Sequence, residues 1–296
     1  MQWKYQLLAA TIILTMWCTK GYAQNGNDPL FLNYHFYPGA DFKEREGKSA
    51  VQSFEAGILT PAVRLGKRTM LVNGFNYRFA GYDFDELHTA YSGLPDHLHD
   101  IRYSLIINHQ LNQQWGILAV PRVNLRSDLQ DGISGNDLFP GITALALRAS
   151  SRHANLRYGF GVMYNNDLNR HSIIPAAALF YTTEKMRISI VTPNGQLIFT
   201  PSKRFEYGFM VNVDAGIFHT SMDSLSHGPV AYIRTFNLLL SPVASFNICR
   251  NLWLNAKAGY ALMRRYDLLD ADFEDEQEWR QDDLGNGPYV TIGISM

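Results

Sequence analysis

Cysteine is scarce in this chain of 296 residues, which contains only Cys18 and Cys249. Cys18 lies in an N-terminal segment that we expect to be removed, so one cysteine would remain and an intrachain disulfide is excluded. The fold must therefore be held by hydrogen bonds and packing. Long apolar runs are also missing beyond that N-terminal segment. The mature chain is therefore either soluble or spans a membrane as strands.

An excess of charge of either sign is absent as well. The chain has 26 Lys and Arg residues against 27 Asp and Glu residues, a formal net charge of −1 at pH 7. No basic excess favours nucleic acid as a partner. The sequence also lacks a Gly-rich phosphate loop, a paired-cysteine zinc motif and a dinucleotide fingerprint. We therefore predict no cofactor and no nucleic-acid partner.

Residues 1–23 have the pattern of a secretory signal peptide. A short basic start precedes an apolar stretch at 7–14, and Gly21-Tyr22-Ala23 places small residues where a signal peptidase needs them. The apolar stretch is too short to cross a bilayer as a helix. We expect cleavage after Ala23. A lipoprotein is the alternative because Cys18 lies in the right region, but Trp17 stands where a small residue is needed.

Residues 154–166 show the pattern that recurs along most of the chain. Successive residues of a strand point to opposite faces of a sheet. Here one face is polar or bare, with Met163 as its one apolar member. The other face is apolar and consists of Leu156, Tyr158, Phe160, Val162 and Tyr164. An apolar face for lipid and a polar face for a wet lumen are typical of a transmembrane β-barrel.

The sequence therefore predicts an all-β fold, an antiparallel transmembrane β-barrel of about 14 strands, with 12 as the alternative. The barrel is expected over residues 51–296, and residues 24–50 form either a first strand or a plug. Strands are expected at 31–37, 51–64, 69–81, 98–111, 114–127, 140–150, 155–165, 172–183, 185–192, 196–201, 204–219, 229–248, 252–264 and 288–296.

The connections between these strands alternate in length. One set is short, and the other is mostly long, with the Pro193–Gly195 turn as its exception. Transmembrane barrels have short periplasmic turns and longer outer loops, whereas a soluble β-sandwich has no reason to sort its loops in this way. The long set comprises residues 38–50, 82–97, 128–139, 166–171, 220–228 and 265–287.

Charged residues fall on the polar face of the predicted strands. An Arg or Lys on the lipid face near the bilayer midplane costs about 2–4 kcal/mol, so their positions indicate which face is the lumen. Inward charges would set the selectivity of a channel. The candidate lumen-lining residues are Arg102, Arg122, Arg126, Arg157, Arg204, Glu206, Asp214 and Lys257, with Asp100 as a further counter-charge.

Three predicted strands depart from the alternation. Asn73 interrupts the apolar face of 69–81, and both faces of 172–183 and 229–248 are largely apolar. The sequence leaves two explanations open: a β-bulge, or a plug that covers part of the lumen wall.

Several motifs resemble a family of outer-membrane β-barrel proteins of the Bacteroidota, catalogued as a domain of unknown function. The resemblance covers roughly residues 50–220 and implies a barrel in the outer membrane of a Gram-negative cell, but it carries over no functional residues. The chain departs from such barrels at its end, because Met296 replaces the usual terminal aromatic residue. The motifs are Leu71-Val72-Asn73-Gly74-Phe75-Asn76-Tyr77, Leu98-His99-Asp100-Ile101, Asp131-Gly132-Ile133-Ser134-Gly135-Asn136-Asp137 and Gly159-Phe160-Gly161-Val162-Met163-Tyr164-Asn165-Asn166-Asp167.

The segment 96–100 is the best candidate for a metal site. His97 and His99 are two apart, so on a strand they point the same way, and carboxylates that include Asp100 flank them. His88 lies just upstream. Because the spacing fixes no third ligand, a polar loop that enters a strand is the alternative, and no metal site is predicted.

Two loops carry other reactive groups. The loop 265–287 is rich in carboxylates that could bind Ca²⁺ or Mg²⁺ and so bridge to lipopolysaccharide, but it lacks the EF-hand pattern and a solvated loop is the alternative. The segment 219–227 combines Ser, His and Asp, as lipid hydrolases do. Its spacing cannot establish a nucleophile–base–orienter geometry.

Three classes of function follow. We favour a channel or transporter for small solutes or hydrophobic compounds. The alternatives are a closed structural or adhesion barrel that acts through its outer loops, and a lipid-modifying enzyme built around the histidines. We expect that the protein is not an enzyme. Expected partners are outer-membrane lipids or lipopolysaccharide and the barrel-assembly machinery, and the sequence does not identify the solute.

Overall fold

The structure is a computed structural model. In the part of the chain that it describes, no helix is long and apolar enough to cross a membrane. The predicted signal peptide lies outside that part. The described residues are 29–41, 43, 48–85, 95–153, 155–167, 171–221, 230–273 and 281–296.

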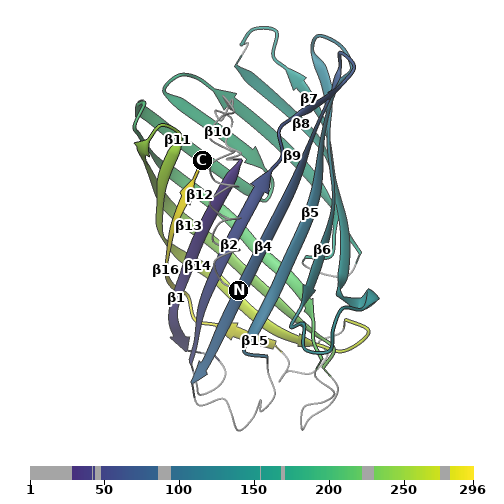
Figure 1. Ribbon diagram of the computed structural model, residues 1–296, viewed down its shortest axis with the longest axis vertical. Coiled ribbons are helices and arrows are strands. Elements are labelled where there is room, and N and C mark those ends of the chain that lie inside the picture. Colours follow the sequence, from purple (N-terminus) through teal and green to yellow (C-terminus); the bar gives the residue numbers. More distant parts are fainter. Residues whose placement is uncertain are drawn as a thin grey trace, which may run out of the picture.

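Fourteen long antiparallel strands form one closed ring, which confirms the predicted fold class (Figure 1). The ring closes because β1 pairs with β16 on one side and with β2 on the other. Two short strands, β3 (Val63–Leu65) and β15 (Gln281–Leu284), add to it. The long strands are β1 (Leu30–Asp41), β2 (Lys48–Leu59), β4 (Thr69–Asp85), β5 (His97–Gln110), β6 (Trp115–Ser127), β7 (Leu138–Ala149), β8 (Leu156–Asn165), β9 (Ser172–Thr182), β10 (Met186–Val191), β11 (Asn194–Ser202), β12 (Phe205–His219), β13 (Tyr232–Cys249), β14 (Leu252–Leu269) and β16 (Gly287–Ser295).

The two ends of the barrel differ in the length of their connections, as the sequence predicts. The short turns lie at the end where β1 begins and β16 ends, which we call the short-turn end; the C-terminus marks it in Figure 1. The opposite end, the long-loop end, carries β15 and the short 3-10 helix η3 (Gly135–Asp137). One predicted loop, 265–287, is partly strand, because β14 continues to Leu269 and β15 pairs with it. Its inward Tyr266 and Leu268 are buried, and this packing extends the strand.

A belt of apolar side chains covers the outside of the ring. The outward side chains of the strands are aromatic or aliphatic and exposed, such as Phe75, Phe160 and Ile292, each with more than half of its surface accessible. Such a belt would be unfavourable in water and is typical of β-barrels that cross a membrane. At the short-turn end, the Arg148 guanidinium lies 5.6 Å from the ring of Trp115, an aromatic–cation pair typical of a membrane interface.

The strands with two apolar faces now have a physical explanation. In β9 the inward Ala176 and Ala178 pack in a buried cluster with Leu145 and Leu147 of β7. Gly161 on β8 makes this possible, because a Cβ there would collide with the backbone of β7. In β13 the inward side chains pack against other walls of the barrel, and the register shifts between Leu238 and Leu239. Packing between inward side chains of different strands therefore accounts for the apolar inner faces.

Candidate functional site: the lumen

The lumen encloses a cavity of about 350 Å³. It is lined mainly by polar and charged inward side chains from both halves of the ring. Six cationic side chains and four carboxylates line it, so the lining carries a positive excess when histidine is neutral. The cations are Arg78, Arg102, Arg122, Lys257, Arg264 and Arg265, and the carboxylates are Glu55, Asp100, Asp167 and Asp214.

One ion pair crosses the lumen. Arg78 lies on β4 and Asp214 on β12, and at least five strands separate these two in either direction around the ring. The Arg78 guanidinium donates to Asp214 Oδ1 at 2.6 Å, and each side chain keeps less than a quarter of its surface exposed. A charged hydrogen bond of this length between opposite walls constricts the lumen.

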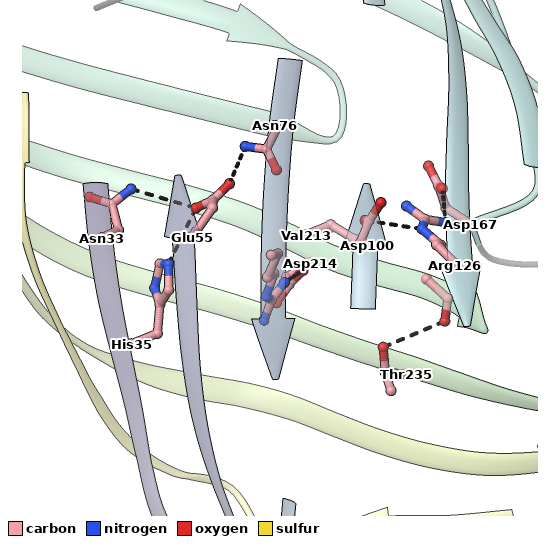
Figure 2. A network of polar contacts seen from close by, with 12 residues as sticks. Asn33, His35, Glu55, Asn76, Asp100, Arg126, Asp167, Val213, Asp214 and Thr235 are labelled. Atoms are coloured by element: carbon pink, nitrogen blue, oxygen red, sulfur yellow. Dashed lines mark hydrogen bonds and ion pairs between the residues drawn. The ribbon is translucent and has the colours of Figure 1, made fainter. Parts of the chain in front are cut away.

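A second cluster of charges lies beside β5 and β6 (Figure 2). The guanidinium of Arg126 is buried and donates to Asp100 at 3.1 Å and to Asp167 at 2.7 Å. Arg122 also donates to Asp167, and Arg102 donates to Asp100 at 3.2 Å. Burial raises the pKa of Asp167, but Arg126 and Arg122 outweigh it and hold that pKa below its usual range. Three cations thus share two carboxylates.

Glu55 on β2 organises a third group of polar contacts. Asn76 donates to Glu55 at 2.8 Å, Asn33 lies at 3.5 Å, and a ring nitrogen of His35 lies at 3.3 Å (Figure 2). The other ring nitrogen of His35 lies 2.9 Å from the Thr291 hydroxyl. These contacts join β1, β2, β4 and β16, so they fix the wall of the barrel where the ring closes.

Two further cations of the lumen lie on β14. Within the described residues neither Lys257 nor Arg264 has an ion-pair partner, and both line the cavity. The Arg264 guanidinium lies 5.5 Å from the ring of Tyr37, and its Nε has no hydrogen-bond partner. Cations that line a lumen without an ion-pair partner among the described residues favour the entry of anions.

At the long-loop end an apolar cluster packs across the lumen. Phe84 and Leu98 from β4 and β5 pack in one buried group with Phe218, Ile233 and Leu268 from β12, β13 and β14. The Arg126 guanidinium also lies 5.8 Å from the ring of Phe218. The two sets of strands lie on opposite walls. The cluster therefore narrows the lumen between the ion pairs and the long loops.

The structure brings only part of the predicted selectivity set together. Arg102, Arg122, Asp214 and Lys257 line the cavity, as does the counter-charge Asp100. Arg126 is almost completely buried behind them. Three predicted residues lie elsewhere: Glu206 bonds Arg187 and Thr200, Arg157 is exposed on β8, and Arg204 lies in an exposed turn at the short-turn end.

Five charged cavity residues are absent from the predicted set: Glu55, Arg78, Asp167, Arg264 and Arg265. Arg78 and Asn76 alternate with the apolar Phe75, Tyr77 and Phe79, so the same period of two would have found them. Arg264 stood at the end of a predicted strand that continues further. Asp167 lies in a loop that folds into the lumen, and no periodic signal marks it.

The histidine candidates do not converge with their predicted partners. His97 and His99 lie on the outward face of β5, where His99 packs against Tyr77 and Phe79, whereas Asp100 points into the lumen. Among the residues that the structure describes, no group of three or more His, Cys, Asp or Glu side chains could hold a metal ion. His88 lies outside the described residues.

The Ser–His–Asp segment is divided as well. The Nδ1 of His219 lies 2.9 Å from Asp137, whereas the hydroxyl of Ser221 donates to Asp128 at 2.8 Å. Burial raises the pKa of Asp137, but hydrogen bonds from Ser134, Ser127 and His219 hold that pKa below its usual range. His227 lies outside the described residues. In the acidic loop, Asp267 accepts from Arg234 at 2.8 Å, which is an ion pair rather than an open cation site.

These features define the class of the protein: a closed antiparallel β-barrel with an apolar outer belt and a charged, constricted lumen. The chain belongs to the family described as "Domain of unknown function (DUF6268)", whose sequence profile matches residues 20–296. No curated protein matches the sequence.

Solved structures with a similar fold include three outer-membrane proteins. The NanC porin is 8% identical with a TM-score of 0.38, covering 90% of this chain and 98% of its own. The translocator domain of the autotransporter NalP from Neisseria meningitidis is 12% identical with a TM-score of 0.35, covering 98% of both chains. The Pseudomonas putida toluene transporter TodX is 9% identical with a TM-score of 0.34, covering 92% and 90%. Such low values do not identify a substrate.

Proposed function

We propose that this protein is an outer-membrane channel for small solutes in a Gram-negative cell, with a preference for anions. The cavity of about 350 Å³ inside a closed barrel carries this proposal, because charged side chains surround it and cations outnumber carboxylates. In the cell, the short-turn end would face the periplasm and the long-loop end the outside.

The outer belt supports the membrane location. A β-strand needs about 9–11 residues to cross a bilayer, and all of the fourteen ring strands except β10 have at least nine. Their outward side chains present aromatic and aliphatic groups all round the ring. We also propose that the protein is not an enzyme, since His219 and Ser221 bond separate carboxylates rather than each other.

The ion pair of Arg78 with Asp214 makes the proposed channel narrow. A solute must pass two charged groups that are held together across the lumen, so we expect small conductance and strong discrimination by charge. Lys257 and Arg264, which have no ion-pair partner in the part of the chain that the structure describes, supply the anion preference.

The reversal potential of the refolded protein under a KCl gradient tests the proposal. It should report chloride preference in the wild type. Lys257→Met should move it toward the cation side by removing a cavity charge, and Lys203→Met is the matched control because Lys203 is exposed in a turn at the short-turn end. Cation preference in the wild type, or equal shifts for both variants, would contradict the proposal.

A closed barrel that acts through its outer loops is the second candidate. The apolar cluster around Leu98 and Phe218 favours it, because that cluster narrows the lumen at the long-loop end. A folded wild-type barrel without conductance that conducts after Phe218→Ala would support this second function over the first.

A further inference from the structure

The hydrogen-bonded wall is interrupted between β9 and β12. The strands β10 and β11 lie between them but form a short hairpin, whose turn is Thr192–Pro193. The last contacts are from Thr192 N to the Ala177 carbonyl at 3.0 Å and from Val213 N to the Asn194 side chain at 2.7 Å. Beyond them, within the described residues, 173–176 of β9 and 214–218 of β12 have a strand partner on one side only. We call this interruption the lateral notch.

The end of β12 leaves the wall at this point. His219 pairs in parallel with Ser127 of β6, although five strands separate β12 from β6 along the shorter arc of the ring. Ile217 shares the face of β12 that carries the lipid-exposed Phe209, yet Ile217 is completely buried and belongs to a cluster with Phe139 of β7. β12 therefore passes inside the neighbouring wall instead of continuing it, which opens the space beside β9.

The lumen cavity extends to the lateral notch. Asn194, Val213 and Ala215 line the cavity together with Asp167. In a continuous wall, Val213 and Ala215 would point to lipid, since they alternate with the inward Asp214. That both residues line the cavity is an observation separate from the strand pairing. It also indicates that the wall is open at the lateral notch.

The rims of the lateral notch are apolar and lie within the outer belt. On β9 the outward residues are Ile173, Pro175 and Ala177, and Ile173 has 73% of its surface exposed. Ile173 pairs with the outward Tyr164 of β8. The hairpin turn at Thr192 contacts Ala177, which is four residues nearer the short-turn end than Ile173. The notch therefore faces the half of the bilayer next to the long loops. A charged solute that left the lumen there would lose its hydration water, which is costly. An apolar solute would not meet this cost.

We propose that the lateral notch is a passage by which uncharged apolar solutes move between the lumen cavity and the outer half of the bilayer. This proposal rests on the proposed channel function and names a second substrate class for it. The polar lumen would carry small charged solutes along its axis. The notch would connect the same cavity sideways to lipid. A solute that used it would not have to pass the apolar cluster that narrows the long-loop end.

Photolabelling in liposomes tests the passage. The probe is 3-trifluoromethyl-3-(3-iodophenyl)diazirine, an uncharged compound that dissolves in lipid. Met210 lines the cavity, so labelling of Met210, read by mass spectrometry, reports entry of the probe. We expect Met210 to be labelled in the wild type. Filling either rim, with Ala215→Trp or with Ala177→Trp, should reduce that labelling by about fivefold or more, because a close-packed indole leaves no path.

Ala256→Trp is the matched control, since Ala256 alternates with the inward Lys257 on β14 and is paired on both sides, with Ala244 and Ile292. It should leave Met210 labelling unchanged. A wild type labelled at the outward Phe209 but not at Met210, or equal labelling in notch and control variants, would overturn the proposal. Two variants on separate rims guard against one that does not fold. Conductance measured on the same samples tests the channel function separately, so either proposal can fail alone.

Discussion

The ion pair between Arg78 and Asp214 should stabilise the barrel by joining its opposite walls. Asp214→Ala leaves the Arg78 guanidinium without its partner at a site where 24% of that side chain is exposed. Removing one partner of a buried pair costs about 3–5 kcal/mol. Since both side chains keep some contact with lumen water, we expect a lower loss, about 2 kcal/mol in the free energy of unfolding.

A double-mutant cycle separates the pair from the other contacts of each residue. The variants Arg78→Ala, Asp214→Ala and the double variant are unfolded with urea from phospholipid vesicles, with tryptophan fluorescence as the signal. We expect the double variant to lose less than the sum of the single variants, with a coupling energy of about 1–2 kcal/mol. Asp214→Asn keeps an acceptor without the charge and should recover less than half of the loss.

Conductance supplies an independent readout of the same pair. The double variant should conduct more than the wild type, because the constriction across the lumen is removed. A coupling energy below about 0.3 kcal/mol, which is within the usual error of additivity, would refute the reasoning that this pair joins the walls. Unchanged conductance in a folded double variant would refute its role as the constriction.

Three other predictions follow from the same lumen. Phe218→Ala should enlarge the opening at the long-loop end and raise single-channel conductance, whereas an unchanged value would show that the apolar cluster is not limiting. Gly161→Val should destabilise the barrel by about 2 kcal/mol or more in urea unfolding, because its Cβ would collide with the backbone of β7; a change within about 0.5 kcal/mol would contradict this close approach. The pKa of Asp167 is lowered in the fold, so its stabilisation is complete above its unfolded pKa of about 3.9 and is lost as the pH falls through the lower folded value. The difference in unfolding free energy between wild type and Asp167→Asn should therefore be constant from pH 7 to about pH 5 and shrink in more acidic buffer.

Most of the barrel could be predicted because strand periodicity is a local signal. Each predicted strand corresponds to a long strand of the ring, and the short connections fall at one end. The departures have physical causes that are not local. β14 runs to Leu269 because Tyr266 and Leu268 meet residues of β4 and β5 across the lumen, which only the closed ring brings together.

The site was less predictable for the same reason. Alternation assigns Arg102, Arg122 and Asp214 to the lumen, and the cavity contains them. It cannot show that Asp214 bonds Arg78 from the opposite wall, because that contact depends on how the ring closes. Nor can it exclude Arg204, since parity alone does not tell a lumen position from an exposed turn. Asp167 enters the lumen from a loop, where no periodic pattern exists.

Single-channel recording in a planar bilayer tests the central claim most directly. Heat-modifiable gel mobility first establishes that the refolded sample is a barrel. We predict small, stable conductance steps that favour anions, and larger steps after removal of the pair of Arg78 with Asp214. A folded barrel that shows no steps, either as the wild type or without that pair, would contradict the claim that this protein is a channel.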